Sequence, residues 1–148
     1  MPQGPSPSLP YIAARLDRTV RVGIDRAVSP QGISVNQYKM LSALALQPDL
    51  SGAQLARRAY VSPQSMSETL LALERLGLVK RLPDPNHGRI LRCRLTAKGR
   101  KLVERCNREV ESVEASMIRG MSPADQDTLR NLMVQAVRNL DGGFPERH

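Results

Sequence analysis

Two short helical segments joined by only a few residues constrain the fold of this chain more than any other feature. A capping box that starts at Ser51 predicts a helix over 52–59, and Ser62 before a proline predicts a second helix over 63–76. The link between them is residues 60–62. Helices joined so briefly cross at a steep angle, so the pattern predicts a helix-turn-helix.

The second of these helices has an apolar side and a polar side. Its apolar residues recur at spacings of four and three, which predicts a buried face. The predicted contacts join Met66, Leu70 and Leu73 to Leu55, Ala56 and Val61. The opposite side carries Gln64, Glu68 and Arg75, flanked by Ser65 and Ser67. Small hydroxyls and an amide can approach the base edges of DNA closely, although a merely solvated face has the same composition.

A β-hairpin is predicted directly after the two helices. Short β-type runs over 79–82 and 90–95 flank a turn-rich loop, and Gly77 marks the end of the helix before them. Further helices are predicted over 9–27, 35–46, 97–119 and 123–140, with Gly142 as the last stop. Three helices followed by two strands is the order of a winged helix. The predicted fold is therefore mainly α with a small β-hairpin.

The net charge of +8 falls in one stretch of the chain, from Arg75 to Arg105. This stretch has ten basic residues against Asp84 and Glu104, whereas the rest of the chain is balanced. An uncompensated basic block predicts a face that binds a polyanion. The basic residues are Arg75, Lys80, Arg81, Arg89, Arg92, Arg94, Lys98, Arg100, Lys101 and Arg105.

Within the hairpin, the arginines alternate with apolar residues. Arg92 and Arg94 should therefore share one face of the strand, with Leu91, Cys93 and Leu95 on the other. Arg89 follows a glycine at the tip of the loop, where an arginine is suited to enter a narrow minor groove. A solvated face is again the alternative.

Five motifs in order resemble the MarR family of bacterial transcriptional regulators, and the resemblance covers about residues 34–105. The motifs are Ser51-Gly52-Ala53-Gln54-Leu55-Ala56, Val61-Ser62-Pro63-Gln64-Ser65-Met66-Ser67, Leu73-Glu74-Arg75-Leu76-Gly77-Leu78-Val79, Arg81-Leu82-Pro83-Asp84-Pro85-Asn86 and Leu95-Thr96-Ala97-Lys98-Gly99. The resemblance implies a homodimer on a pseudo-palindromic operator, with helix 63–76 in the major groove and the hairpin in the minor groove. It makes Pro63, Gln64, Ser65 and Ser67 contacts to bases or phosphates, and Arg89 the wing-tip arginine.

The sequence departs from this family in two places. His87 and Gly88 precede Arg89, whereas the family usually has an acid two residues before the arginine. Glu68 stands where a basic residue is frequent, and an acid there would repel phosphate or accept from cytosine. The full predicted DNA-binding set is Ser62, Pro63, Gln64, Ser65, Ser67, Glu68, Arg75, Arg81, Arg89, Arg92 and Arg94.

The helices outside the winged domain carry apolar stripes that suggest dimerisation. We predict a disordered tail over 1–8, a DNA-binding domain over 34–96, and a dimerisation region from 9–33 together with 97–141. Closure of a monomeric core is the alternative. The stripes are Ile12, Leu16, Val20 and Ile24; Leu102, Val103, Cys106, Val110, Val113 and Met117; and Leu129, Leu132, Met133, Ala136, Val137 and Leu140.

Other functions find no support in the sequence. No enzyme motif, cofactor motif, metal-ligand cluster or membrane-spanning run is present, and a cytoplasmic location is expected. The resemblance implies a small aromatic effector, but no residue carries over for it. Cys93 and Cys106 should be buried, and a sensing role for either stays open. We expect a transcriptional regulator that acts as a repressor. The alternatives are a nonspecific architectural DNA-binding protein and a winged helix used for protein contacts.

Overall fold

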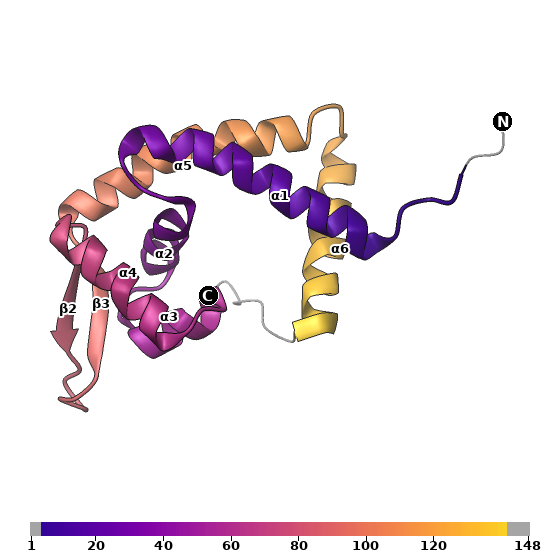
Figure 1. Ribbon diagram of the computed structural model, residues 1–148. Helices are drawn as coiled ribbons and strands as arrows, with labels where there is room; N and C mark the ends of the chain where they lie inside the picture. The colour runs from indigo at the N-terminus through magenta and orange to yellow at the C-terminus, as the bar shows by residue number, and fades with distance from the viewer. Residues whose placement is uncertain (1–3, 142–148) are drawn as a thin grey trace. The chain divides into compact units, whose positions relative to one another are not determined.

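The computed structural model describes residues 4–141, so residues 1–3 of the predicted tail and the predicted stop at Gly142 lie outside it. The chain divides into two compact units, Met1–Val113 and Glu114–His148. The predicted order of helices and strands is confirmed (Figure 1). The elements are α1 (Leu9–Val28), the 3-10 helix η1 (Ser29–Gln31), α2 (Val35–Leu46), β1 (Leu50–Ser51), α3 (Gly52–Ala59), α4 (Pro63–Arg75), β2 (Val79–Pro83), β3 (Leu91–Leu95), α5 (Ala97–Met117) and α6 (Pro123–Asp141).

Side-chain caps fix where the helices of the winged domain begin. Ser34 Oγ accepts from the Gln37 amide at 3.1 Å while Gln37 Oε1 accepts from the Ser34 amide at 3.0 Å. Ser51 and Gln54 repeat this reciprocal box at the start of α3. Both boxes are confirmed, because each satisfies two amides that the first turn of a helix leaves unpaired.

The sheet has three strands, in the order β1-β3-β2, and all pairs are antiparallel. β2 and β3 pair from Val79 opposite Leu95 to Pro83 opposite Leu91, which confirms the hairpin. The sequence did not predict β1, where Leu50 lies opposite Cys93. A strand of two residues has no alternation from which it could be recognised.

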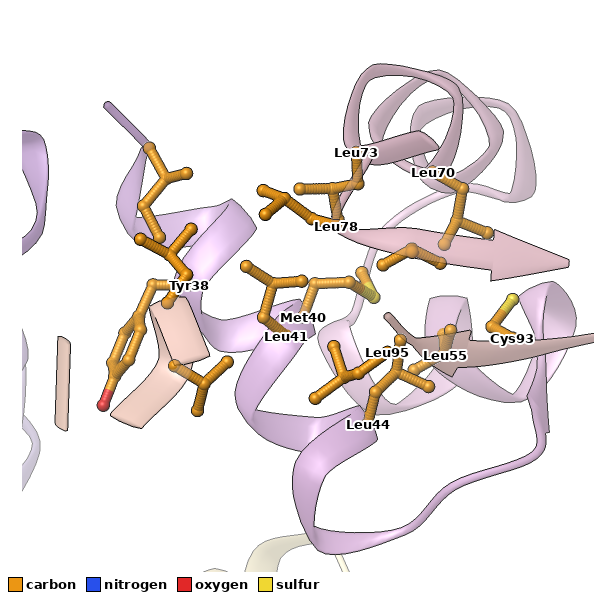
Figure 2. Packing of buried hydrophobic residues seen from close by; sticks show 14 of the residues in the cluster. Tyr38, Met40, Leu41, Leu44, Leu55, Leu70, Leu73, Leu78, Cys93 and Leu95 are labelled. Atoms are coloured by element: carbon orange, nitrogen blue, oxygen red, sulfur yellow. The ribbon is translucent and has the colours of Figure 1, made fainter. Parts of the chain in front are cut away.

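Aliphatic side chains from α2, α3, α4 and β3 form one core (Figure 2). Leu41, Leu70 and Leu73 are almost completely buried, as expected for an interior without tryptophan. The prediction that Val61 packs in this core is wrong, since 39% of its surface is exposed. Its amide closes the end of α3 by donating to the Ala56 carbonyl at 3.1 Å, which leaves the side chain at the surface.

The first turns of α5 belong to the same core. Leu102, Val103 and Cys106 are buried in it, so this helix does more than carry a dimerisation stripe. Gly99 lies directly against the backbone of Leu78, the residue before β2. A Cβ at position 99 would come 2.1 Å from the Leu78 carbonyl oxygen. Only glycine permits so close an approach of helix and backbone.

Polar contacts join the C-terminal end of α4 to the start of α5. Thr96 Oγ1 donates to the Gly77 carbonyl at 2.6 Å, and Lys98 Nζ donates to the Leu76 carbonyl at 2.8 Å. Lysine is favourable there because the last carbonyls of a helix carry partial negative charge. We call these contacts, together with the packing of Gly99 on Leu78, the α4–α5 joint.

Apolar side chains on α1 and α6 remain exposed in the single chain. On α1, Ile12 is 45% exposed. On α6, Leu132 is 58% and Leu140 is 91% exposed. Among residues 4–141, no helix is both long and apolar enough to cross a membrane.

Candidate nucleic-acid interface

The N-terminal half of α4 presents a polar surface. Pro63, Gln64, Ser65, Ser67 and Glu68 are all exposed, whereas the Met66 between them is buried. The exposure predicted for this face is confirmed. No acidic residue lies in the first turn of α4, so the positive end of its helix dipole meets no opposing charge there.

Ser62 is engaged in holding this helix rather than free for a ligand. Its Oγ accepts from the Ser65 amide at 3.1 Å and donates to Ser65 Oγ at 3.0 Å. The cap therefore orients Ser65, whose hydroxyl keeps its own hydrogen for another acceptor. At the other end of α4, Arg75 is exposed.

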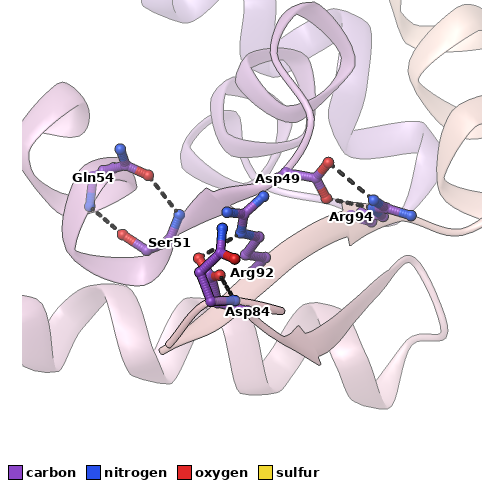
Figure 3. A network of polar contacts seen from close by, with 7 residues as sticks. Asp49, Ser51, Gln54, Asp84, Arg92 and Arg94 are labelled. Atoms are coloured by element: carbon purple, nitrogen blue, oxygen red, sulfur yellow. Dashed lines mark hydrogen bonds and ion pairs between the residues drawn. The ribbon is translucent and has the colours of Figure 1, made fainter. Parts of the chain in front are cut away.

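Arg92 is paired inside the wing, as Figure 3 shows. Its Nε lies 2.7 Å from Oδ2 of Asp84, a carboxylate that is only 9% exposed. Asp84 Oδ1 also accepts from the Asn86 amide at 2.7 Å. The Asn86 amide and the Arg92 guanidinium hold the pKa of Asp84 below its ordinary value. We call Asp84 and Arg92 the wing brace, because they tie the loop to β3.

Arg94 pairs with Asp49, which precedes β1 (Figure 3). The contact is bidentate, with Nη2 3.0 Å from Oδ2 and Nε on Oδ1. Hydrogen bonding and charge from Arg94 lower the pKa of Asp49, and Asp49 raises the pKa of Arg94. Asp49 adopts a left-handed backbone with φ of 66°, a conformation that aspartate tolerates better than most residues.

Arg81 forms the third pair, with Glu74 near the end of α4. The prediction that no acids balance the charge of the basic block is therefore wrong for three arginines of the hairpin. Two of the acids, Asp49 and Glu74, lie outside the block in sequence and meet it only through folding. The third, Asp84, lies within the block and ties the loop to β3, although His87 stands where the family usually has an acid. The position of Asp84 between two prolines is the feature of the sequence that could have indicated this pairing.

Arg89 stays exposed at the turn of the wing. It also lines a hollow of about 330 Å³ between the start of α3 and the wing. This hollow is lined by two arginines, of which Arg81 is paired with Glu74, and by apolar side chains. Its lining residues are Ser51, Gly52, Ala53, Leu70, Arg81, Arg89, Ile90 and Leu91.

The two cysteines are packed in the interior, as expected. Both thiols are fully buried, and burial raises the pKa of Cys93 and of Cys106. No group of three His, Cys, Asp or Glu residues that could hold a metal ion occurs in the part of the chain that the structure describes.

Comparisons with known proteins show which family this chain resembles. A family model described as MarR family matches residues 31–90. The HTH-type transcriptional repressor Rv2887 of Mycobacterium tuberculosis is 33% identical over 125 residues, which cover 84% of this chain and 90% of that protein. Its crystal structure in complex with salicylic acid has a TM-score of 0.72 at 31% identity, covering 88% of this chain and 97% of the other.

A mutant MarR from E. coli complexed with operator DNA shares the fold. Its TM-score is 0.77 at 22% identity, over 87% of this chain and 93% of that chain. The exposed polar face of α4 and the braced hairpin beside it thus occur in a chain that is similar, over most of its length, to proteins named repressors. The protein belongs to the MarR family of transcriptional regulators.

Proposed function

We propose that the protein binds a pseudo-palindromic DNA operator as a homodimer and represses transcription from it in the cytoplasm. The observation that carries the proposal is the exposed amide and hydroxyl surface of α4 beside a wing that is braced internally and keeps Arg89 exposed. The operator complex of the E. coli neighbour and the repressor names of the relatives support it.

The ion pairs separate three of the predicted DNA-binding residues, the paired arginines of the hairpin, from the residues proposed to contact DNA directly. Gln64, Ser65 and Ser67 are proposed to meet base edges in the major groove, and Arg89 to enter the minor groove. Glu68 selects against phosphate or accepts from cytosine N4. Ser62 positions α4, while Pro63 and Arg75 meet the phosphate backbone. The three paired arginines, Arg81, Arg92 and Arg94, position the wing and contribute mainly to the local potential.

A binding experiment tests this proposal. A duplex with an inverted repeat, taken from DNA next to the coding region, should be bound and protected from nuclease over two half-sites about one helical turn apart. Arg89→Ala should weaken binding about tenfold or more, and Gln64→Ala should relax base preference in each half-site. Arg138→Ala, which removes the same charge from α6, is the matched control.

Other results would favour the competing functions. Equal affinity for every duplex with a steep salt dependence would mean an architectural DNA-binding protein. No measurable affinity for any duplex would leave only a winged helix that contacts proteins.

A small aromatic acid is the proposed effector. The salicylic acid complex of Rv2887 supports this chemistry, and the hollow offers it Arg89 for a carboxylate and apolar side chains for a ring. Salicylate should release the operator in a titration, whereas cyclohexanol, a ring without a carboxylate, should not. Release that persists in an Ile90→Glu variant would place the effector elsewhere.

A further inference from the structure

The C-terminal end of α3 has an unusual residue. Its cap is Tyr60, whose φ of 53° and ψ of 41° are left-handed. This backbone conformation is strained for a residue with a Cβ. At three comparable turns among the described residues the chain has glycine instead, at Gly32, Gly77 and Gly120. A glycine would be the expected residue at position 60 as well.

The tyrosine side chain gives the fold nothing in return. It is 75% exposed, so it adds little to the packing of the fold. Only the backbone of Tyr60 serves the turn, through an amide that donates to Ala56 and Arg57. Strain that packing does not explain is a sign of function.

The position of Tyr60 indicates what that function is. It lies between α3 and the cap of α4, two residues before Ser62. When the start of a recognition helix enters the major groove, the helix before it crosses the phosphate backbone. The last turn of α3 has Arg57 exposed and no acid, so nothing there repels phosphate.

We propose that the Tyr60 hydroxyl donates a hydrogen bond to a phosphate at the edge of the major groove, a backbone contact that fixes the depth of α4. The inference rests on the proposed function. Tyrosine is one of the side chains that commonly bind phosphate oxygens, and such contacts position a protein without reading sequence. The contact therefore strengthens binding to every duplex.

Tyr60→Phe is the direct test, because it removes one oxygen and keeps both ring and backbone. Affinity should fall about tenfold for the inverted repeat and for unrelated duplex alike. The dependence of affinity on salt should keep its slope, since no charge is lost.

Tyr60→Gly separates binding from stability. Glycine relieves the left-handed backbone, so the midpoint of urea unfolding should rise while DNA affinity falls. Unchanged affinity of Tyr60→Phe would overturn the inference while leaving the proposed function intact, provided that Arg89→Ala still weakens binding. A wild-type chain that binds no duplex would overturn both.

Discussion

Among the glycines that the structure describes, Gly99 has the least room for a side chain. The Leu78 carbonyl oxygen occupies the space that a side chain at position 99 would need. This oxygen belongs to the backbone, so it cannot rotate away. The lysine and glycine at the start of α5 are thus structural, although Lys98 also counts in the basic block.

We predict that Gly99→Ala lowers the free energy of unfolding by about 2 kcal/mol, the cost typical of overpacked cores. Urea denaturation followed by circular dichroism measures this. Gly88→Ala is the matched control, because a Cβ at Gly88 meets nothing within 4 Å. An equal effect of both substitutions would show that Gly99 is not specially constrained.

The two aspartates that pair with arginines of β3 predict that the stability of the fold depends on pH. Asp49 and Asp84 have lowered pKa values in the folded state, so their stabilisation is complete above the unfolded value of about 3.9 and is lost as pH falls through the folded values. Unfolding free energies measured down to about pH 3 should fall more steeply for the natural chain than for Asp84→Asn. Parallel curves would contradict the pairing.

The thiols should be nearly inert in the native protein. Their raised pKa leaves less thiolate than the ordinary cysteine value of about 8.5 allows, and burial blocks access. Modification by Ellman's reagent at pH 7.5 should wait for unfolding, with free cysteine as the control. Fast reaction of either thiol in the folded chain would reopen an oxidant-sensing role.

Sequence reasoning succeeds for residues whose partners are close in the chain. The caps at Ser34 and Ser51 have partners three residues away, so their spacing is visible in the sequence. The pair between Arg94 and Asp49 joins residues 45 positions apart, and no pattern in either segment records it. For this reason the exposed face of α4 could be predicted, whereas the pairing of the hairpin arginines could not.

At the scale of elements, the wing is a hairpin held at both ends. The wing brace fixes its loop, and the pair of Arg94 with Asp49 fixes β3 to the chain before β1. An exposed arginine on a rigid support loses less conformational entropy on binding than one on a mobile loop. The wing brace would thus favour the proposed contact of Arg89 with DNA by holding the loop in place.

Asp84→Asn should therefore weaken operator binding about three- to tenfold with Arg89 unchanged, although it removes a negative charge. A purely electrostatic effect would strengthen binding instead. Fluorescence anisotropy with a labelled duplex distinguishes the two signs. Asp125→Asn, which removes an acid from α6, controls for net charge.

At the scale of the whole molecule, the apolar side chains of α6 call for a partner. The proposed homodimer would cover Leu132 and Leu140 with a second copy. Leu132→Glu should weaken self-association at least tenfold in sedimentation equilibrium. Leu46→Glu, at an 88% exposed leucine of α2, is the control and should leave association unchanged. A monomer in the unchanged chain would contradict the dimer itself.

The α4–α5 joint has a mechanical consequence for such a dimer. Because Thr96 and Lys98 donate to the carbonyls of Gly77 and Leu76, just after α4, and Gly99 packs on the backbone of Leu78, we expect a tilt of α5 to move the end of α4 with it. In the proposed homodimer, an effector that tilts the α5 helices of the two copies would therefore change the distance between their two α4 helices. Such an effector would control repression through this spacing, without touching the residues proposed to contact DNA.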